Sequence, residues 1–212
     1  MTRYNSDQLA SFPWIVSTDT LRTEDLLVRY WQTAEQLGAE LCTVLPALQH
    51  LVGEDSRESD WDDDMAGGCL LQLGDILQDV APTGFCFGAS EGDGACFGFW
   101  LSEEWAEALE ERGIDCEDPA GTAELIQAFD DHGIEAEQLC DAYCGTADGY
   151  SEAQAGADYA QTLADDIGAI NRELAWPHTC IDWTEAWREL EIGDGYSLIR
   201  ETSSSWHVVR SV

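Results

Sequence analysis

The sequence contains no lysine. Its nine basic side chains are all arginine, they stand against 43 Asp and Glu residues, and the formal net charge of the 212-residue chain is -34. Nucleic acids and anionic membranes carry the same sign of charge and repel such a chain. We therefore expect basic partners, and we expect no direct binding to nucleic acid or to membranes.

Long apolar runs and closely paired cysteines are missing as well. No window approaches the roughly 20 apolar residues of a membrane span, and the N-terminus has no apolar stretch of signal-peptide length. None of the eight cysteines belongs to a Cys-x-x-Cys pair. These absences predict a soluble, cytoplasmic protein whose thiols are free and mostly buried.

Large apolar residues, by contrast, are plentiful. Hydrophobic residues make up 44% of the chain, which has nine Trp, six Tyr and six Phe. A chain of this charge without such residues would remain disordered, whereas this one can form a core. Acid-rich, lysine-free surfaces are also typical of salt-adapted proteins, so composition alone leaves two explanations for the charge open.

The first hundred residues predict helices packed on a small sheet. A helix is expected over 20–51, with Thr23 as its N-cap and with Pro46 kinking or dividing its C-terminal part. A second helix is expected around 70–77. The stretch 84–100 has two aromatic runs on either side of EGDG, which is typical of a β-hairpin.

From residue 101 the pattern changes to short helices separated by Gly and acidic breaks. Ser102, Thr122 and Ser151 can cap three of them, and Asp182 followed by Glu185 forms a capping-box pattern for a fourth. The tail 195–212 predicts a terminal hairpin whose apolar side consists of Tyr196, Leu198, Trp206, Val208 and Val209.

A calcium site can be considered at the acidic cluster 60–64, because EF-hand loops begin with alternating Asp residues. Counting from the first Asp, Met65 stands where the loop needs Gly, and Leu71 stands where it needs Glu. We interpret the cluster as a solvated acidic loop.

A zinc site can be considered around Cys140 and Cys144, which lie four apart on a predicted helix. His132 precedes them, and His178 and Cys180 follow. The spacing matches no standard zinc module. Small apolar core cysteines are therefore the favoured interpretation.

A phosphate-binding loop can be considered at Gly92, Gly94 and Gly98. Such loops lead from a strand into a helix, whereas this one leads into a second strand-like run and contains Glu91 and Asp93. A tight hairpin turn is the favoured interpretation.

Catalytic groups are difficult to assemble from this composition. Paired carboxylates are uninformative among 43 acids, and four His with nine Arg leave few groups to stabilise a developing negative charge. A reactive thiolate is disfavoured in so negative a field. We expect no catalytic residue, no metal and no cofactor, and hence a protein that is not an enzyme.

Some acids stand where helix stability disfavours them. Asp130 and Asp131, like Asp165 and Asp166, fall at the expected C-terminal ends of helices, where the dipole favours cations by about 0.3–1 kcal/mol. A surface selected to present anions would place them there, and general salt adaptation could do the same. At one charge per roughly 1.7 Å, the net charge corresponds to about 58 Å of duplex, or some 17 base pairs, and a dimer would double that.

The second half of the chain resembles the ArdA antirestriction family. The segment DAYCGTADGYSEAQAGADYAQTLADDIG, then IDWTEAWRELEIGDGYSLIR, then WHVVR carry the resemblance, which extends over about 101–210. The matching positions are Tyr143, Gly145, Tyr159, Ala160, Ile181, Asp182, Trp183, Arg188, Glu189, Leu190, Tyr196 and Val208. The first hundred residues depart from the family pattern.

The resemblance implies an elongated, dimeric mimic of bent B-form DNA that blocks type I restriction and modification enzymes. We therefore predict a strongly acidic α+β protein of two small mixed domains. These are an N-terminal helical domain with a β-hairpin (1–100) and an ArdA-like α+β domain (101–212). It is expected to form a homodimer that occupies the basic DNA-binding cleft of a defence complex.

The predicted binding surface consists of acids of the second half that stand for phosphates. They are Glu103, Glu104, Glu107, Asp130, Asp131, Asp141, Asp148, Glu152, Asp158, Asp165, Asp166, Glu185, Glu189 and Glu191. Three alternatives remain open at this point: an inhibitor of a CRISPR effector, a salt-adapted enzyme with a thiol or metal site, and an acidic binder of basic proteins.

Overall fold

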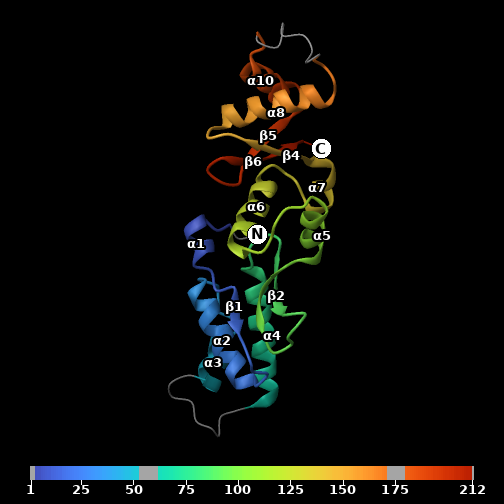
Figure 1. Ribbon diagram of the computed structural model, residues 1–212. Helices are drawn as coiled ribbons and strands as arrows, with labels where there is room; N and C mark the ends of the chain where they lie inside the picture. Colours follow the sequence, from blue (N-terminus) through green and yellow to red (C-terminus); the bar gives the residue numbers. More distant parts are fainter. Residues whose placement is uncertain (1–2, 53–61, 171–179, 212) are drawn as a thin grey trace. The chain divides into compact units, whose positions relative to one another are not determined.

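The protein is described by a computed structural model that covers residues 3–52, 62–170 and 180–211 (Figure 1). The chain forms two compact units, Met1–Ala106 with Cys116–Glu124 and Glu107–Asp115 with Leu125–Val212. Each unit combines helices with a three-stranded antiparallel sheet, which confirms the predicted α+β class. The predicted domain bounds stay a prediction.

The first unit packs two helices against one face of its sheet, whose strand order is β1-β3-β2. Side chains along each strand point alternately to the two faces of the sheet. Phe87 and Phe97 therefore both face the core, where their rings contact Tyr30 of α2. The predicted hairpin is confirmed, with Phe85 paired to Leu101. The elements are α1 (Ser6–Ala10), β1 (Ile15–Ser17), α2 (Thr23–Gln36), α3 (Leu45–Val52), α4 (Asp63–Asp79), β2 (Phe85–Ala89) and β3 (Phe97–Leu101).

The helix predicted over 20–51 is divided into α2 and α3, but the division lies before Pro46 and not at it. Gly38, with φ of 69°, ends α2 in the left-handed conformation that Gly adopts without strain. Pro46 does not kink a helix but lies in the first turn of α3, where its missing N–H is not needed. Arg22, not Thr23, is the N-cap residue of α2.

The second unit has a sheet of order β4-β6-β5 with α8 and α10 on one face. Trp187 of α10 packs on Tyr159 of α8, and Trp206 and Val208 of the sheet complete this core. Phe129 contacts His207, which alternates with Trp206 and Val208 along β6. The elements wholly in this unit are α7 (Ala136–Ala142), β4 (Tyr143–Asp148), α8 (Glu152–Asp166), α10 (Trp183–Asp194), β5 (Tyr196–Arg200) and β6 (Ser205–Arg210). Helices α5 (Glu103–Glu111) and α6 (Pro119–Asp131) each begin in the first unit and end in the second.

Two of the predicted N-cap residues of the later helices are confirmed, and a third is wrong. Ser151 accepts a hydrogen bond from the backbone N–H of Gln154, and Asp182 caps α10, as predicted. Thr122 does not cap a helix: it lies inside α6 and is buried. The carboxylate of Asp118, just before Pro119, accepts the backbone N–H groups at the start of that helix instead.

Two expectations about the second unit are wrong, the first because β4 was not anticipated and the second because side chains alternate along β6. Cys140 lies on α7 but Cys144 lies on β4, so they do not share a helix. The terminal hairpin β5–β6 is confirmed, but Val208 and Val209 point to opposite faces of the sheet. Both are buried, which shows that both faces of β6 are covered in this unit.

All eight cysteines are free, as predicted, but the expectation that most are buried is wrong. Only Cys69 is buried, whereas Cys42, Cys86, Cys116 and Cys180 are exposed. Cys86 shows the reason. Its neighbours along β2 face the core, so strand alternation turns the thiol to the other side of the sheet.

Candidate functional site

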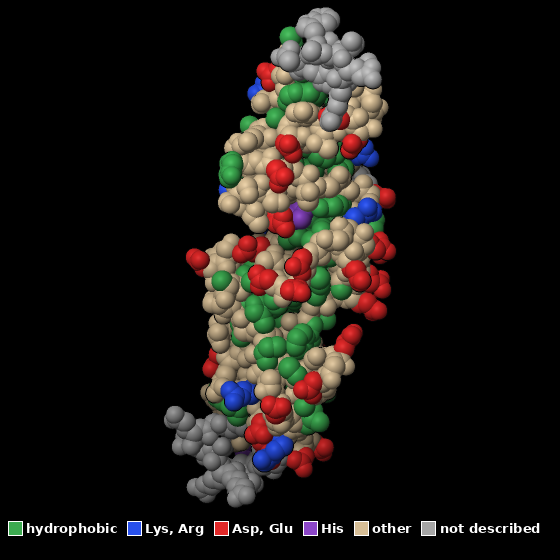
Figure 2. Space-filling model, in the orientation of Figure 1, with side chains coloured by type: hydrophobic (Ala, Val, Ile, Leu, Met, Phe, Trp, Pro, Cys, Tyr) green, Lys and Arg blue, Asp and Glu red, His purple; other side chains and the backbone are tan. Residues whose placement is uncertain are grey.

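The acidic side chains of the described residues lie at the surface. Every Asp and Glu in the described ranges is exposed except Asp130 and Asp165, which are half-buried, and none is buried. On the face shown in Figure 2, Asp and Glu side chains lie over each unit, and the blue Arg side chains are fewer. No described carboxylate is therefore enclosed in the core of either unit.

The fourteen predicted acids do not converge on one point. Glu103 and Glu104 belong to the first unit, and the other twelve belong to the second. Within the second unit the structure brings Asp148 and Asp158 together, because the backbone N–H of Asp148 donates to a carboxylate oxygen of Asp158 at 3.3 Å. The arrangement is a distributed surface and not a pocket.

The acids at helix ends lie where the sequence predicts them. Helix α6 ends at Asp131 and α8 ends at Asp166. Among the helices of the described ranges, α3 alone has a basic residue, His50, in its last turn. The negative ends of the other helix dipoles thus add to the negative potential of the surface.

Several arginines bind carbonyl groups and aromatic rings instead of neutralising acids. A guanidinium N–H of Arg112 donates to the backbone carbonyl of Cys140. Arg200 lies 5.4 Å from the ring centroid of Trp206 and donates to the carbonyl of Thr202 at 3.0 Å. Arg210 similarly lies over Tyr196. These cations hold the fold and leave the carboxylates largely uncompensated.

Two ion pairs are fully at the surface. Arg22 contacts Glu24 at 2.8 Å, and Arg188 contacts Glu185 at 3.0 Å. Exposed pairs of this kind contribute between about 0 and 1 kcal/mol, because water screens them and the side chains lose entropy. They do not cancel the acidic field.

The described residues of the acidic cluster considered for calcium form the N-terminal end of helix α4. The first residue of the cluster, Asp60, lies outside the described residues. Asp62 caps α4 by accepting the backbone N–H of Met65 at 2.9 Å, and Asp63 and Asp64 lie in the first turn, next to the positive end of the dipole.

The glycines considered for a phosphate loop connect β2 to β3. The carboxylate of Asp93 accepts the backbone N–H of Ala95 at 3.0 Å, and Ser90 donates to Cys96 across the turn at 2.7 Å. The turn leads from strand to strand, so its backbone N–H groups do not meet a helix start.

The cysteines considered for zinc make other contacts. The thiol of Cys140 donates to the carboxylate of Glu111 at 2.8 Å, and Cys144 packs against the core of the second unit. The ring of His132 lies 2.8 Å from the carbonyl of Ala128, and His178 lies outside the described residues. In the part of the chain that the structure describes, no three His, Cys, Asp or Glu side chains are grouped so that they could hold a metal ion.

A buried polar group lies in the second unit where the sequence indicated none. His207 is 3% exposed, and its Nδ1 lies 3.2 Å from the hydroxyl of Tyr143. Its Nε2 has no hydrogen-bond partner and lies 3.9 Å from a carboxylate oxygen of Glu201. Burial lowers the pKa of His207, and the negative charge of Glu201 opposes that shift.

The same burial raises the pKa of Tyr143, and Glu201 raises it further. The two rings therefore form a neutral pair inside the second unit. A substrate cannot reach a histidine that is so enclosed, so the pair is a structural feature of the sheet.

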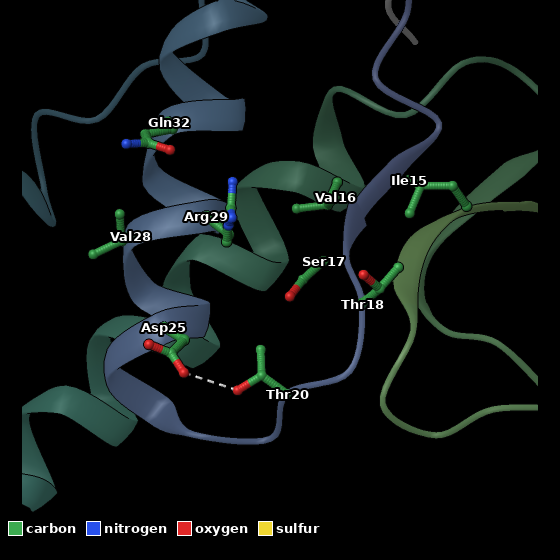
Figure 3. A pocket seen from close by; sticks show the side chains of 9 residues that line it. All are labelled: Ile15, Val16, Ser17, Thr18, Thr20, Asp25, Val28, Arg29 and Gln32. Atoms are coloured by element: carbon green, nitrogen blue, oxygen red, sulfur yellow. Dashed lines mark hydrogen bonds between the residues drawn. The ribbon is translucent and has the colours of Figure 1, made fainter.

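A pocket of about 670 Å³ lies in the first unit between β1 and α2 (Figure 3). Asp25, Val28, Arg29 and Gln32 of α2 line one side of it. The other side consists of Ile15, Val16, Ser17, Thr18 and Thr20. This pocket was not predicted from the sequence. Strand β1 has only three residues, and a segment so short has no alternating pattern that would indicate a strand beside α2.

Within the described residues, no helix is both long and apolar enough to cross a membrane. Comparison with protein-family models, with curated proteins and with solved structures gave no match to this chain. The resemblance of residues 101–210 to the ArdA family therefore rests on the sequence motifs and stays a prediction.

Proposed function

We propose that this protein is a non-enzymatic mimic of double-stranded DNA that occupies the DNA-binding cleft of a host defence enzyme. The proposed target is a type I restriction-modification enzyme, and the mode of action is stoichiometric competition. The observation that supports this proposal is that the described carboxylates, in a chain of net charge -34, are all at the surface. Such a surface offers negative charge and acceptor oxygens to the Lys and Arg side chains of the target that would otherwise bind DNA phosphates.

The use of arginine in the second unit supports the same proposal. Within the described residues, Arg112, Arg200 and Arg210 contact carbonyl groups and aromatic rings, so they hold no surface carboxylate in an ion pair.

Helix α10 illustrates the local spacing. Glu185 and Glu189 are both exposed and lie one helical turn apart, which separates their side chains by about 6 Å. Glu191 adds a further exposed carboxylate. Spacings of this order can meet successive cations of a cleft that contacts phosphates every 3.4 Å of duplex axis along one strand.

We further propose that the active form is an elongated homodimer, in line with the resemblance to ArdA. Sedimentation of the purified protein measures both the mass and the frictional ratio. A compact monomer at micromolar concentration would contradict this part of the proposal and leave the competition model to be tested separately.

The deciding experiment is competition with DNA for a purified type I enzyme. Inhibition should fall as duplex DNA is added, and binding of the protein to the enzyme should weaken steeply as salt rises. Labelled duplex should not bind to the isolated protein. A ternary complex at saturating DNA, or tight binding of duplex to this protein alone, would refute the mimic.

A further inference from the structure

The pocket between β1 and α2 has the form of a groove with two parallel walls. Asp25, Val28, Arg29 and Gln32 recur at the i, i+3, i+4 and i+7 positions of α2, so they form one stripe along the helix. Figure 3 shows this stripe on one side, and β1 with the loop after it on the other. The stripe extends over about 10 Å at 1.5 Å per residue.

The opposite wall is an edge strand. In the order β1-β3-β2, β1 is the outer strand, and within the described residues it pairs with β3 alone. Backbone N–H and C=O groups along its other edge are therefore available to a further strand. At about 3.3 Å per residue, residues 15–18 also extend over about 10 Å, so the two walls match the length of a short extended peptide.

Arg29 is the one cation among the residues that line this groove, and Asp25 is the one anion. Arg29 is exposed, and within the described residues no carboxylate lies in ion-pair contact with it, although acids outnumber arginines in the chain by 43 to nine. The nearby carboxylate of Asp25 already accepts a hydrogen bond from the hydroxyl of Thr20 at 2.9 Å. A guanidinium without a partner binds carboxylates in a two-point contact.

We propose that this groove binds an extended peptide that pairs with the free edge of β1 and places a carboxylate on Arg29. Aliphatic side chains of the peptide contact Val28 and Ile15, the latter 49% exposed, and the exposed amide of Gln32 is available for hydrogen bonds. The volume of the groove, about 670 Å³, lies within the range of volumes of ligand pockets.

An acidic ligand on an acidic protein is physically reasonable at this site. The Debye length is about 8 Å at physiological salt, so the charges next to the ligand dominate over the distant acids. Adding a strand to a sheet edge between a strand and a helix supplies main-chain hydrogen bonds for affinity, and the contact with Arg29 supplies specificity. The site belongs to the first unit and does not depend on the proposed DNA mimicry.

The test is a selection of random nonapeptides on the full-length protein. We expect enrichment of aliphatic, strand-forming peptides with Asp or Glu at one position. Synthetic copies with amidated C-termini should retain binding if the carboxylate is a side chain and lose it if it is the chain end. Arg29→Gln should weaken binding at least tenfold, and Arg29→Glu should shift the preference to peptides with Lys or Arg.

Two controls separate strand pairing from simple charge attraction. Arg188→Gln removes an exposed arginine of the second unit and should leave peptide binding unchanged. N-methylation of the peptide at alternate residues should abolish binding in one register and spare it in the other. Absence of enrichment, binding that ignores Arg29, tolerance of N-methylation at every residue, or preference of the unaltered protein for basic peptides would each overturn the proposal.

Discussion

The indole ring of Trp187 occupies the space that a side chain on Gly156 would need. A Cβ built on Gly156 would overlap the indole, so α8 and α10 approach each other as closely as they do because residue 156 has no side chain. Core packing thus holds α8 and α10 together.

Gly156→Ala is therefore expected to destabilise the protein by roughly 1–3 kcal/mol, because the added methyl group overpacks the core. The measurement is the free energy of unfolding in denaturant. Gly68→Ala is the matched control, since Gly68 lies on helix α4 with nothing within 4 Å of its missing Cβ. That substitution should stabilise by about 0.5–1 kcal/mol, and equal effects at the two sites would contradict the packing described.

The buried His207 predicts a specific pH dependence of stability. Burial lowers its pKa in the folded state, so the unfolded chain binds a proton at a pH where the folded chain does not. Stability from this group is therefore full above the ordinary histidine pKa of 6.5 and falls as pH drops from there towards the lowered value.

The measurement is the difference in unfolding free energy between the natural protein and His207→Gln across that pH window. We expect the natural protein to lose more stability than the variant as pH falls. His132→Gln is the control, because His132 is exposed. If the difference between the natural protein and His207→Gln does not change with pH, the histidine is not held neutral by burial.

Salt should stabilise the folded protein. Exposed carboxylates repel one another, and added salt screens that repulsion, so the unfolding midpoint should rise between low salt and about 0.15 M. Thermal unfolding followed by circular dichroism measures this directly. A chain that is molten at 0.15 M and folds only in molar salt would instead indicate salt adaptation as the reason for the acidity.

Binding through a distributed acidic surface predicts that single neutralisations matter little. Glu189→Gln alone should leave inhibition of the type I enzyme nearly unchanged, because one screened contact contributes at most about 1 kcal/mol. The combined Glu185→Gln, Glu189→Gln and Glu191→Gln variant should inhibit clearly less well. Loss of all inhibition from the single substitution would indicate a discrete site, and thermal unfolding of both variants checks that the fold is intact.

Local features of the chain were predictable where the signal and the structure lie in the same few residues. Ser151 and Asp182 cap helices because a side-chain oxygen bonds an N–H two or three residues later. The β2–β3 hairpin was predictable because its two aromatic runs are joined by a short Gly-containing turn. The exposure of the acids was predictable because a carboxylate is costly to bury.

Non-local pairings were missed for the corresponding reason. β1 has three residues and exists because it pairs with β3, more than 80 positions later in the chain. Tyr143 and His207 are 64 residues apart, so no motif joins them. Cys144 was assigned to a helix because the local sequence continues α7, whereas pairing of β4 with β6 ends that helix at Ala142.

By itself the sequence determined the sign of the surface, the mixed α+β class and the starts of α8 and α10. These follow from charge, composition and hydrogen bonds within one turn of chain. Tertiary structure alone decided that Val208 and Val209 are both buried, that His207 is enclosed beside Tyr143, and that Arg29 faces an open strand edge. Each of these depends on a sheet that forms only when segments far apart in the chain pair with each other. The sequence of one segment does not indicate which distant segment it pairs with.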